Sequence, residues 1–301
     1  MRVAVTGATG LVGSALVRAL RERGDEVTAL SRDPAGARAS LDVDAVAWRP
    51  LEEPAPAAGL AGRDAVVHLA GESVAQRWTA QARRRIRDSR VAGTDNLVAG
   101  LRAAEPRPSA LVSASGVGYY GARGDEELDE SAEPGDDFLA RVCVEWEAAA
   151  RRAEELGVRV VTVRTGVALA RTGGALARML PFFRAGVGGP VAGGRQYVPW
   201  IHLDDLVGIY LAALDGDRWA GPVNACAPEP ATNRQLSRAL GRALHRPAFA
   251  PVPGLAVRAL YGRMAQVVTE GQRAVPDQAR RLGYGFRHPD LDEALRSALG
   301  G

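Results

Sequence analysis

The chain has 301 residues, 47% hydrophobic and 24% charged, which is usual for a soluble globular protein of one large domain or two closely packed ones. Its 38 basic and 35 acidic residues leave a net charge of +3, and this near balance argues against a dedicated nucleic-acid surface. All 38 basic residues are arginines, because the sequence contains no lysine. A Schiff base, or any other step through a side-chain amine, is therefore excluded.

The sequence shows no sign of export or membrane insertion. No apolar run approaches about 18 residues, and the start MRVAVTGATG lacks the long apolar core of a signal peptide. Cys143 and Cys226 are far apart and form no CxxC pair, so we expect two free thiols in a reducing compartment. These features predict a cytoplasmic protein with no membrane or nucleic-acid partner.

Short apolar runs alternate with longer amphipathic segments along the first half of the chain. The apolar runs predict strands at residues 3–5, 27–30, 65–70, 109–115 and 158–164. The amphipathic segments predict helices at residues 11–24, 79–104 and 138–156. Such alternation, with strands that are apolar almost without interruption, is typical of an α/β fold with a parallel sheet covered by helices on both faces.

Glycine and proline become frequent beyond residue 164, and the predicted elements become shorter. We therefore predict a nucleotide-binding domain at residues 1–170, whose sheet is partly completed by later segments. Residues 171–301 are expected to form a smaller α+β lobe that binds the substrate.

The stretch TGATGLVG directly follows the first predicted strand and opens the first predicted helix. Its first glycine permits a tight turn, its second lets backbone amides approach a pyrophosphate, and its third lets helix and strand pack closely. This order of strand, turn and helix predicts a Rossmann-type doubly wound sheet that binds a dinucleotide at the helix N-terminus. The expected contacts are Gly7, Thr9, Gly10, Leu11, Val12 and Gly13.

The end of the second predicted strand selects between NAD and NADP. An acidic side chain about 20 residues after the glycines would bind the ribose 2′-hydroxyl of NAD. Here the sequence is LSRDP, and the hydroxyl of Ser31 with the guanidinium of Arg32 suits a 2′-phosphate. We therefore predict NADP(H) as the cofactor. The alternative is that Arg32 is an ordinary surface residue and Asp33 binds the ribose.

Further segments carry a resemblance to a known family. TGATGLVG, HLAG at 68–71, SRVAGTDNLV at 89–98 and SASGVGYYG at 113–121 resemble the extended short-chain dehydrogenase/reductase superfamily. HLAGES, FLARVCVEWE, RTGVALARTGGAL, GGPVAGGRQYVPWIHLDDL and EGQRAVP resemble more closely its atypical, YfcH-like branch of "epimerase family proteins". The resemblance covers essentially the whole chain and implies a C-terminal domain of unknown function from about residue 251.

The resemblance implies a catalytic set of which only part is present. Working members of the superfamily use an Asn, a Ser and a Tyr-xxx-Lys pair, in which Tyr is the general acid/base and Lys lowers its pKa. Arg90 stands at the Asn position and Ser115 at the Ser position. Arg90 would place a positive charge near the cofactor, or it is an ordinary helix-surface arginine. The implied contacts of the HLAG segment with the cofactor are Leu69, Ala70 and Gly71.

The Tyr-xxx-Lys position falls in DFLARVCVEWE, at residues 137–147, but its register is open. Three registers place these pairs at the Tyr and Lys positions: Leu139 with Cys143, Phe138 with Val142, and Asp137 with Arg141. No register supplies Tyr or Lys, so the standard proton relay is absent.

Periodicity predicts a structural role for this helix. An apolar stripe is formed by Leu139, Val142, Cys143 and Trp146. The opposite, polar face carries Asp137, Arg141 and Glu145. We expect the stripe to pack in the core, with Cys143 as a small buried hydrophobe. A nucleophilic Cys143 is the alternative, and it would need a nearby base or cation to form a thiolate.

The candidate catalytic residues are Ser115, Tyr119 and Tyr120, at and just after the end of the strand predicted at 109–115. A tyrosine there would donate a proton to the substrate, or alternatively form an aromatic wall of the pocket. Thr165 and Gly166 follow another strand at the edge where open α/β sheets bind ligands, so we expect backbone contacts to nicotinamide. Glu72 is a weaker catalytic candidate.

Two histidine-containing segments have structural interpretations. In WIHLDD, His202, Asp204 and Asp205 suggest a metal or acid/base cluster, but the preferred interpretation is an aspartate N-cap of the following helix. We therefore predict no metal site. His68, inside an apolar strand, is expected to be a core histidine whose hydrogen bonds are satisfied.

Two functions remain from the sequence. The first is an NADP(H)-dependent oxidoreductase or epimerase that acts on an unidentified small carbonyl or sugar-like substrate, with altered catalytic residues and possible assembly as a homodimer. The alternative is a non-catalytic NADP(H)-binding protein that regulates a partner or senses the redox ratio.

Overall fold

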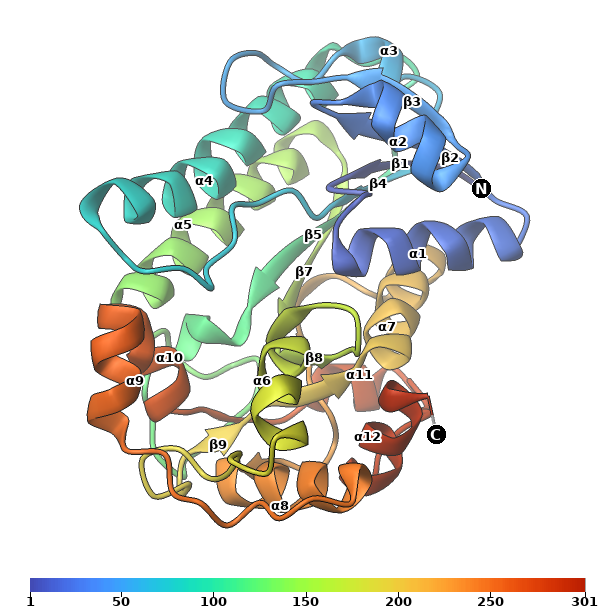
Figure 1. The fold of residues 1–301 in the computed structure, drawn as a ribbon. Helices are drawn as coiled ribbons and strands as arrows, with labels where there is room; N and C mark the ends of the chain where they lie inside the picture. The colour runs from blue at the N-terminus through green and yellow to red at the C-terminus, as the bar shows by residue number, and fades with distance from the viewer. Residues whose placement is uncertain (301) are drawn as a thin grey trace.

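The computed structural model describes residues 1–300 and is built around one seven-stranded parallel sheet (Figure 1). In spatial order the strands are β11 (Gly221–Ala225), β7 (Arg159–Thr165), β5 (Ala110–Gly116), β4 (Ala65–His68), β1 (Arg2–Thr6), β2 (Glu26–Ser31) and β3 (Asp44–Ala47). The order reverses at β1, as in doubly wound folds, and β4 and β5 are buried along nearly their whole length. The predicted Rossmann-type α/β fold is confirmed.

Helices cover both faces of this sheet (Figure 1). One face is covered by α1 (Leu11–Glu22), α2 (Pro34–Leu41), α7 (Leu203–Asp215) and α11 (Asp277–Arg281). The other is covered by α3 (Ala57–Leu60), α4 (Ala80–Ala103), α5 (Phe138–Arg151) and the 3-10 turn η2 (Arg152–Leu156). No helix within residues 1–300 is both long and apolar enough to cross a bilayer.

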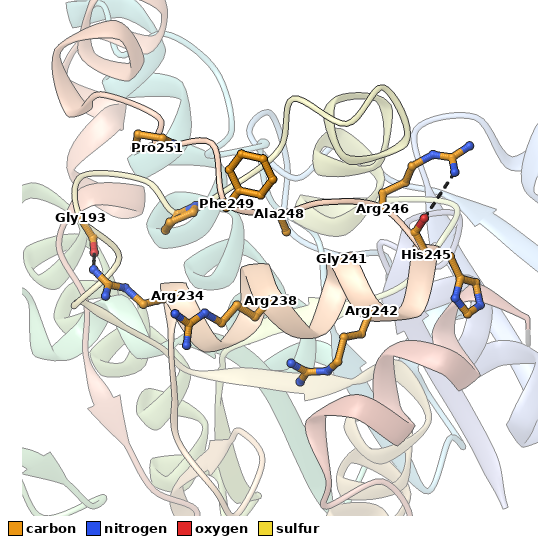
Figure 2. Close-up of a pocket in the computed structure, with 11 residues that line it drawn as sticks. Gly193, Arg234, Arg238, Gly241, Arg242, His245, Arg246, Ala248, Phe249 and Pro251 are labelled. Carbon is orange, nitrogen blue, oxygen red and sulfur yellow. Dashed lines mark hydrogen bonds between the residues drawn. The ribbon is translucent and has the colours of Figure 1, made fainter.

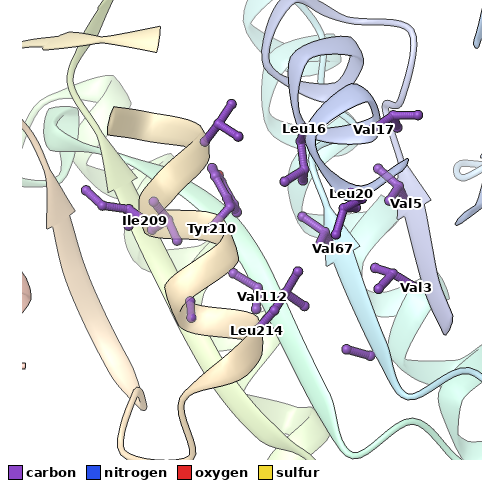
Figure 3. Packing of buried hydrophobic residues seen from close by; sticks show 14 of the residues in the cluster. Val3, Val5, Leu16, Val17, Leu20, Val67, Val112, Ile209, Tyr210 and Leu214 are labelled. Carbon is purple, nitrogen blue, oxygen red and sulfur yellow. The ribbon is translucent and has the colours of Figure 1, made fainter. Parts of the chain in front are cut away.

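The larger core lies between the sheet and the pair α1 and α7 (Figure 3). Leu16 and Leu20 of α1 are four residues apart and therefore lie on one face of the helix, toward Val67 of the sheet. Ile209 and Tyr210 of α7 are buried in the same cluster. This packing fixes the N-terminus of α1 at the carboxyl edge of the sheet.

The second lobe follows β7 and has short elements of both kinds. Its strands pair as β8 (Val167–Leu169) with β10 (Trp200–His202) and β9 (Tyr197–Val198) with β12 (Ala231–Thr232). Its β13 (Arg273–Ala274) pairs with β6 (Glu127–Leu128), which precedes β7 in the chain. Its helical segments are α6 (Gly174–Arg184), α8 (Asn233–Leu244), α9 (Gly254–Tyr261), η3 (Gly262–Ala265), α10 (Gln266–Thr269) and α12 (Leu291–Leu299). The 3-10 turn η1 (Val117–Tyr120) precedes β6. Beyond residue 170, α7 and β11 return to the main sheet; the domain boundary at that residue stays a prediction.

Candidate functional site

The glycine-rich turn between β1 and α1 packs too closely for side chains. Gly7 has a φ of 67°, and a Cβ there would lie 2.7 Å from the carbonyl carbon of Leu69. A Cβ on Gly13 would overlap the carbonyl oxygen of Gly7, which also accepts the N–H of Gly10 at 3.0 Å. Backbone packing therefore requires glycine at positions 7 and 13.

The N-terminus of α1, just after this turn, is open to a ligand. Gly10 is its N-cap, so no side chain accepts a hydrogen bond from the first amide groups, and no acidic residue occupies the first turn. Thr9 and Gly10 are exposed, whereas Leu11 and Val12 are half-buried. Free N–H groups and the helix dipole together make this end suitable for an anion such as a phosphate.

The end of β2 leaves one charged side chain free. The Asp33 carboxylate caps α2 by accepting the N–H of Gly36 at 2.9 Å. Ser31 Oγ lies 3.1 Å from the Asp33 nitrogen and 3.0 Å from its carbonyl oxygen. Arg32 is exposed, and within residues 1–300 its guanidinium makes no hydrogen bond or ion pair. Capping thus occupies Asp33, the alternative ribose ligand.

His68 at the end of β4 holds the turn to α4. Thr6 Oγ1 accepts the N–H groups of Leu69 and Ala70 at 3.2 Å, so its hydroxyl proton is directed to His68 Nδ1 at 2.7 Å. His68 Nε2 then faces Thr94 Oγ1 at 3.0 Å. Burial lowers the pKa of His68 to about 4, with a smaller contribution from the Arg90 charge. The prediction of a satisfied core histidine is confirmed.

Arg90 of α4 turns inward to the end of β4. Its Nη1 donates to the carbonyl oxygens of Glu72 at 2.9 Å and Ile86 at 3.1 Å, and its guanidinium carbon lies 5.0 Å from the Trp146 ring centre. A Cβ on Gly71 would approach that carbon to 3.3 Å. Burial lowers the pKa of Arg90. The charge therefore lies against HLAG rather than on the helix surface.

The register of α5 follows from what its residues face. A Cβ on Gly118 would lie 3.3 Å from Leu139 Cβ, and one on Gly116 would lie 3.9 Å from Cys143 Sγ. Asp137 instead caps α5 by accepting the N–H of Ala140 at 2.9 Å. Of the three registers, the one that aligns Leu139 and Cys143 therefore faces the end of β5.

The Cys143 thiol has the chemistry of a buried hydrophobe. Its pKa is raised to about 12, chiefly by burial and also by the Glu147 carboxylate, and the Arg90 guanidinium opposes this rise. Val142 and Trp146 are buried beside it, as the periodicity predicts. A thiol with this pKa is protonated at neutral pH, so it supplies no thiolate nucleophile.

Ser115 lies above a buried ion pair. Its Oγ donates to Glu147 Oε1 at 2.7 Å, and that oxygen also accepts from Arg164 Nε at 2.8 Å. Arg164 Nη2 reaches the second carboxylate oxygen at 2.9 Å. All three residues are at most 5% exposed. The Ser115 proton is thereby directed into the protein, and its oxygen keeps lone pairs for an incoming donor.

The two tyrosines after Ser115 differ in exposure. The Tyr120 hydroxyl is fully buried, donates to Asn224 Oδ1 at 2.7 Å and accepts from Arg164 Nη1 at 3.0 Å. Burial raises the pKa of Tyr120. Tyr119 is half-buried, with its ring centre 3.5 Å from the Arg164 guanidinium carbon. A buried hydroxyl that already donates and accepts has no proton to offer, so only Tyr119 stays a candidate donor.

The end of β7 lies against the second lobe. Gly166 donates its N–H to the Ala225 carbonyl at 2.9 Å, and a Cβ there would overlap the carbonyl oxygen of Pro199. Thr165 is half-buried beside it. This edge therefore meets β11 and the segment before β10.

An apolar cluster covers the N-terminal end of α5. Trp78, Ile86 and Met264 are buried in it, and the Phe138 ring meets Trp78 edge-on with centroids 5.2 Å apart. Leu139 is half-buried against the same cluster. Since Met264 comes from η3, the tail of the chain supplies part of the apolar wall next to Leu139.

The carboxylates considered from the sequence are already bonded. Glu72 Oε1 accepts from Gln76 Nε2 at 3.0 Å. Asp205 is fully buried and accepts the backbone N–H groups of Arg287 at 2.7 Å and His288 at 2.9 Å. Asp205 thus holds the C-terminal segment to α7, which is a structural role.

The expected aspartate N-cap of α7 is wrong. The helix begins at Leu203, and His202 caps it because its Nδ1 accepts the N–H of Asp204 at 3.1 Å. His202, Asp204 and His288 bring one ligand atom each within 4.8 Å of one another. The capping bond uses Nδ1 of His202, Nε2 of the same ring is buried without a hydrogen-bond partner, and Asp204 is largely exposed. No metal site is proposed here.

The sheet order, the open helix N-terminus and the glycine turn define a Rossmann-type protein whose phosphate-binding edge is formed. Residues 3–225 match the model of the "NAD dependent epimerase/dehydratase family", and residues 252–298 match a "domain of unknown function". The chain belongs to the NAD dependent epimerase/dehydratase family, and the resemblance seen in the sequence is confirmed.

Individual relatives support the same assignment. The chain is 40% identical over 302 residues to the "epimerase family protein SDR39U1 homolog, chloroplastic" of Arabidopsis thaliana, covering 99% of this chain and 87% of that protein. The crystal structure of human epimerase family protein SDR39U1 with NADPH has a TM-score of 0.90 at 38% identity, covering 100% and 99% of the two chains. UDP-glucuronic acid 4-epimerase of Bacillus cereus has a TM-score of 0.80 at 16% identity, covering 100% and 98%, which shows the fold alone.

Sequence reasoning missed the Glu147–Arg164 pair and Asn224. One signal was available: Arg164 lies near the end of a valine-rich strand, and a charge in a covered parallel strand needs a buried partner. The partner itself was not evident, because Glu147 is 17 residues away on a different element.

Proposed function

We propose that the protein is an NADP(H)-dependent oxidoreductase or epimerase of a small carbonyl or sugar-like compound, with a charged group other than lysine in its site. The cofactor choice is supported by human SDR39U1, which was crystallised with NADPH, and by the free Arg32 beside an occupied Asp33. A cytoplasmic location and assembly as a homodimer stay predictions.

The observation that carries the proposal is the inward position of Arg90. Its guanidinium packs beside Gly71. It also lowers the pKa of Cys143, the residue that we align with the Lys position, although burial has the larger and opposite effect on that pKa. A fixed cation there would stabilise negative charge on a substrate oxygen during hydride transfer. Arg cannot accept a proton, so its role is electrostatic.

The cofactor, Ser115 and Tyr119 would each take a different part in the reaction. The cofactor, when bound, supplies or accepts hydride. Ser115 Oγ, whose proton is donated to Glu147, would accept a hydrogen bond from a substrate hydroxyl. Tyr119 is the candidate proton donor for a reduced carbonyl, since it is the half-buried tyrosine of the pair.

A non-catalytic NADP(H)-binding regulator is the second candidate function. It is favoured by the side chains at the Tyr and Lys positions, Leu139 and Cys143, neither of which transfers protons at neutral pH. The Ser115 hydroxyl also favours the regulator, because its proton is already donated to Glu147.

Cofactor binding is tested first, by fluorescence titration with NADPH and NADH. Arg32→Gln should weaken NADPH binding about 10-fold or more, the value of one hydrogen bond to a charged group, and leave NADH unchanged. Arg18→Gln, an exposed arginine of α1, serves as the matched control. Equal affinity of the wild type for both cofactors would rule out the Arg32 assignment.

Turnover is tested separately, by screening carbonyl compounds for NADPH oxidation. Arg90→Gln and Ser115→Ala should each lower kcat at least 10-fold on any accepted substrate, as expected when a group that stabilises developing charge is lost. Tight NADPH binding without turnover on any compound would favour the regulator. Turnover unaffected by Arg90→Gln would remove the electrostatic role.

A further inference from the structure

A cavity lies in the second lobe, and none of its lining residues belongs to the glycine turn (Figure 2). It has a volume of about 850 Å³ and is formed by α8 and the backbone segments around it. The segment after α8 folds back closely, since a Cβ on Gly241 would approach Ala248 Cβ to 2.5 Å. The opposite wall is tied by the Val252 N–H, which donates to Pro190 O at 3.0 Å. We call this cavity the α8 groove.

The α8 groove is lined by basic residues and by no acidic one. Its charged or titratable lining residues are Arg234, Arg238, Arg242, His245 and Arg246. They belong to a longer segment, residues 230–269, that contains six arginines and no Asp or Glu. The whole chain has a net charge of +3, so the residues outside this segment carry −3.

Three of the four groove guanidiniums have no carboxylate partner within residues 1–300. Arg234 donates to the Gly193 carbonyl at 2.8 Å, and Arg246 donates to the Arg184 carbonyl at 3.2 Å. Arg238 makes no hydrogen bond or ion pair in the described chain. Carbonyl contacts fix the positions of two arginines without neutralising their charges. The groove therefore presents an uncompensated positive potential.

The fourth arginine has a different partner. Arg242 donates to both carboxylate oxygens of Asp292 on α12, at 2.8 and 2.7 Å. This pair joins α8 to α12 and reduces the charge at one end of the groove. The free positive charge is consequently concentrated at Arg234, Arg238 and Arg246.

The spacing of the arginines indicates the class of ligand. Arg234 and Arg238 are one helical turn apart, which separates their backbones by about 6 Å along α8. Like charges at this spacing destabilise a helix unless an anion or partner compensates them. A guanidinium group can donate two parallel hydrogen bonds to phosphate oxygens, and it is more weakly hydrated than an ammonium group. A row of arginines therefore suits a phosphorylated ligand.

We propose that the α8 groove binds a ligand with two or more phosphoryl groups, at a site separate from the glycine turn. Phe249 lies at its rim with 81% of its surface exposed, and its ring is available to an apolar or aromatic part of the ligand (Figure 2). The phosphoryl groups come from a soluble phosphate ester or from a lipid headgroup.

The test uses the full chain and tripolyphosphate as the probe, by isothermal titration calorimetry at low salt. We expect binding that weakens as salt increases, and a loss of about 10-fold or more in affinity for Arg238→Gln. Arg234→Gln should show a similar loss. Arg296→Gln, an exposed arginine of α12 outside the groove, is the matched control and should bind as the wild type does.

Two arms distinguish the source of the phosphate. If phosphatidylglycerol vesicles bind the wild type but not Arg238→Gln, a lipid headgroup is the source. If tripolyphosphate binds and the vesicles do not, the ligand is soluble. The absence of tripolyphosphate binding, or equal weakening in Arg238→Gln and Arg296→Gln, would overturn the proposal, since no specific groove contact would then exist.

Discussion

Glu147 of α5 and Arg164 of β7 form a two-point ion pair inside the protein, directly beneath Ser115. The distances are 2.8 Å from Nε to Oε1 and 2.9 Å from Nη2 to Oε2, and the side chains are 1% and 3% exposed. Burial alone would lower the pKa of Arg164, but the hydrogen bonds and charge of Glu147 hold it above its usual range. The pair thus joins the ends of β5 and β7 to α5.

Glu147→Gln should be strongly destabilising, because it leaves the Arg164 charge buried without a counter-charge. Removal of one partner of a buried pair costs about 3–5 kcal/mol of unfolding free energy. Equilibrium unfolding in urea measures the change. Glu145→Gln is the matched control: Glu145 pairs with Arg87 at the surface, where such pairs contribute about 0–1 kcal/mol. Equal losses of unfolding free energy in the two variants would contradict the conclusion that the buried Glu147–Arg164 pair stabilises the fold more than a surface pair does.

Gly13→Ala should destabilise the protein by about 1–3 kcal/mol, since the added Cβ would overlap the Gly7 carbonyl and force the turn open. NADPH affinity should fall with it, because α1 moves away from the phosphate position. Gly285→Ala is the control, at a site with no atom within 4 Å of the added Cβ. Thermal unfolding and cofactor titration check both effects. A stable Gly13→Ala variant with unchanged affinity would show that the turn tolerates a side chain.

Most of the sheet was predictable because its inner parallel strands are covered on both faces and are therefore mostly apolar. The glycine turn was predictable because Gly7 and Gly13 are required by close contacts with neighbouring backbone atoms, and such a requirement is visible in the sequence as a glycine pattern. The short strands of the second lobe, such as β9 and β12 of two residues each, carry too little pattern to predict.

The candidate site was only partly predictable, because its decisive contacts join distant elements. No periodicity shows that the Arg90 side chain turns inward, or that Tyr120 is bonded to Asn224, 104 residues away. The prediction of an aspartate N-cap for α7 was wrong for a local reason. His202 accepts the capping hydrogen bond as aspartate would, and this leaves Asp205 within the helix to bind the tail.

The Cys143 thiol should resist alkylation in the folded protein. With its pKa raised to about 12 by burial, its thiolate population at neutral pH is on the order of 10³-fold below that of a free cysteine. Cys226 is also buried, so neither thiol should react with iodoacetamide until the chain is unfolded in guanidinium chloride. Mass spectrometry follows the labelling. Rapid modification of native Cys143 would revive its assignment as a nucleophile.

His68 should make the fold less stable in mild acid. Burial lowers its pKa from 6.5 to about 4, so below pH 6.5 the unfolded chain binds a proton that the folded chain does not. Stability contributed by the neutral imidazole is therefore complete above pH 6.5 and is lost as the pH falls toward 4, by about 3 kcal/mol in total.

Unfolding free energies at about pH 7, 5.5 and 4.5 measure this loss, since the first value lies above the window between the two pKa values and the other two lie inside it. His68→Gln, whose amide can still meet Thr6 and Thr94, should show a smaller decrease over that range, although it is less stable at pH 7. An NMR titration provides a direct second readout. A His68 imidazole that titrates near pH 6.5 in the folded protein would contradict its burial as a neutral hydrogen-bonded group.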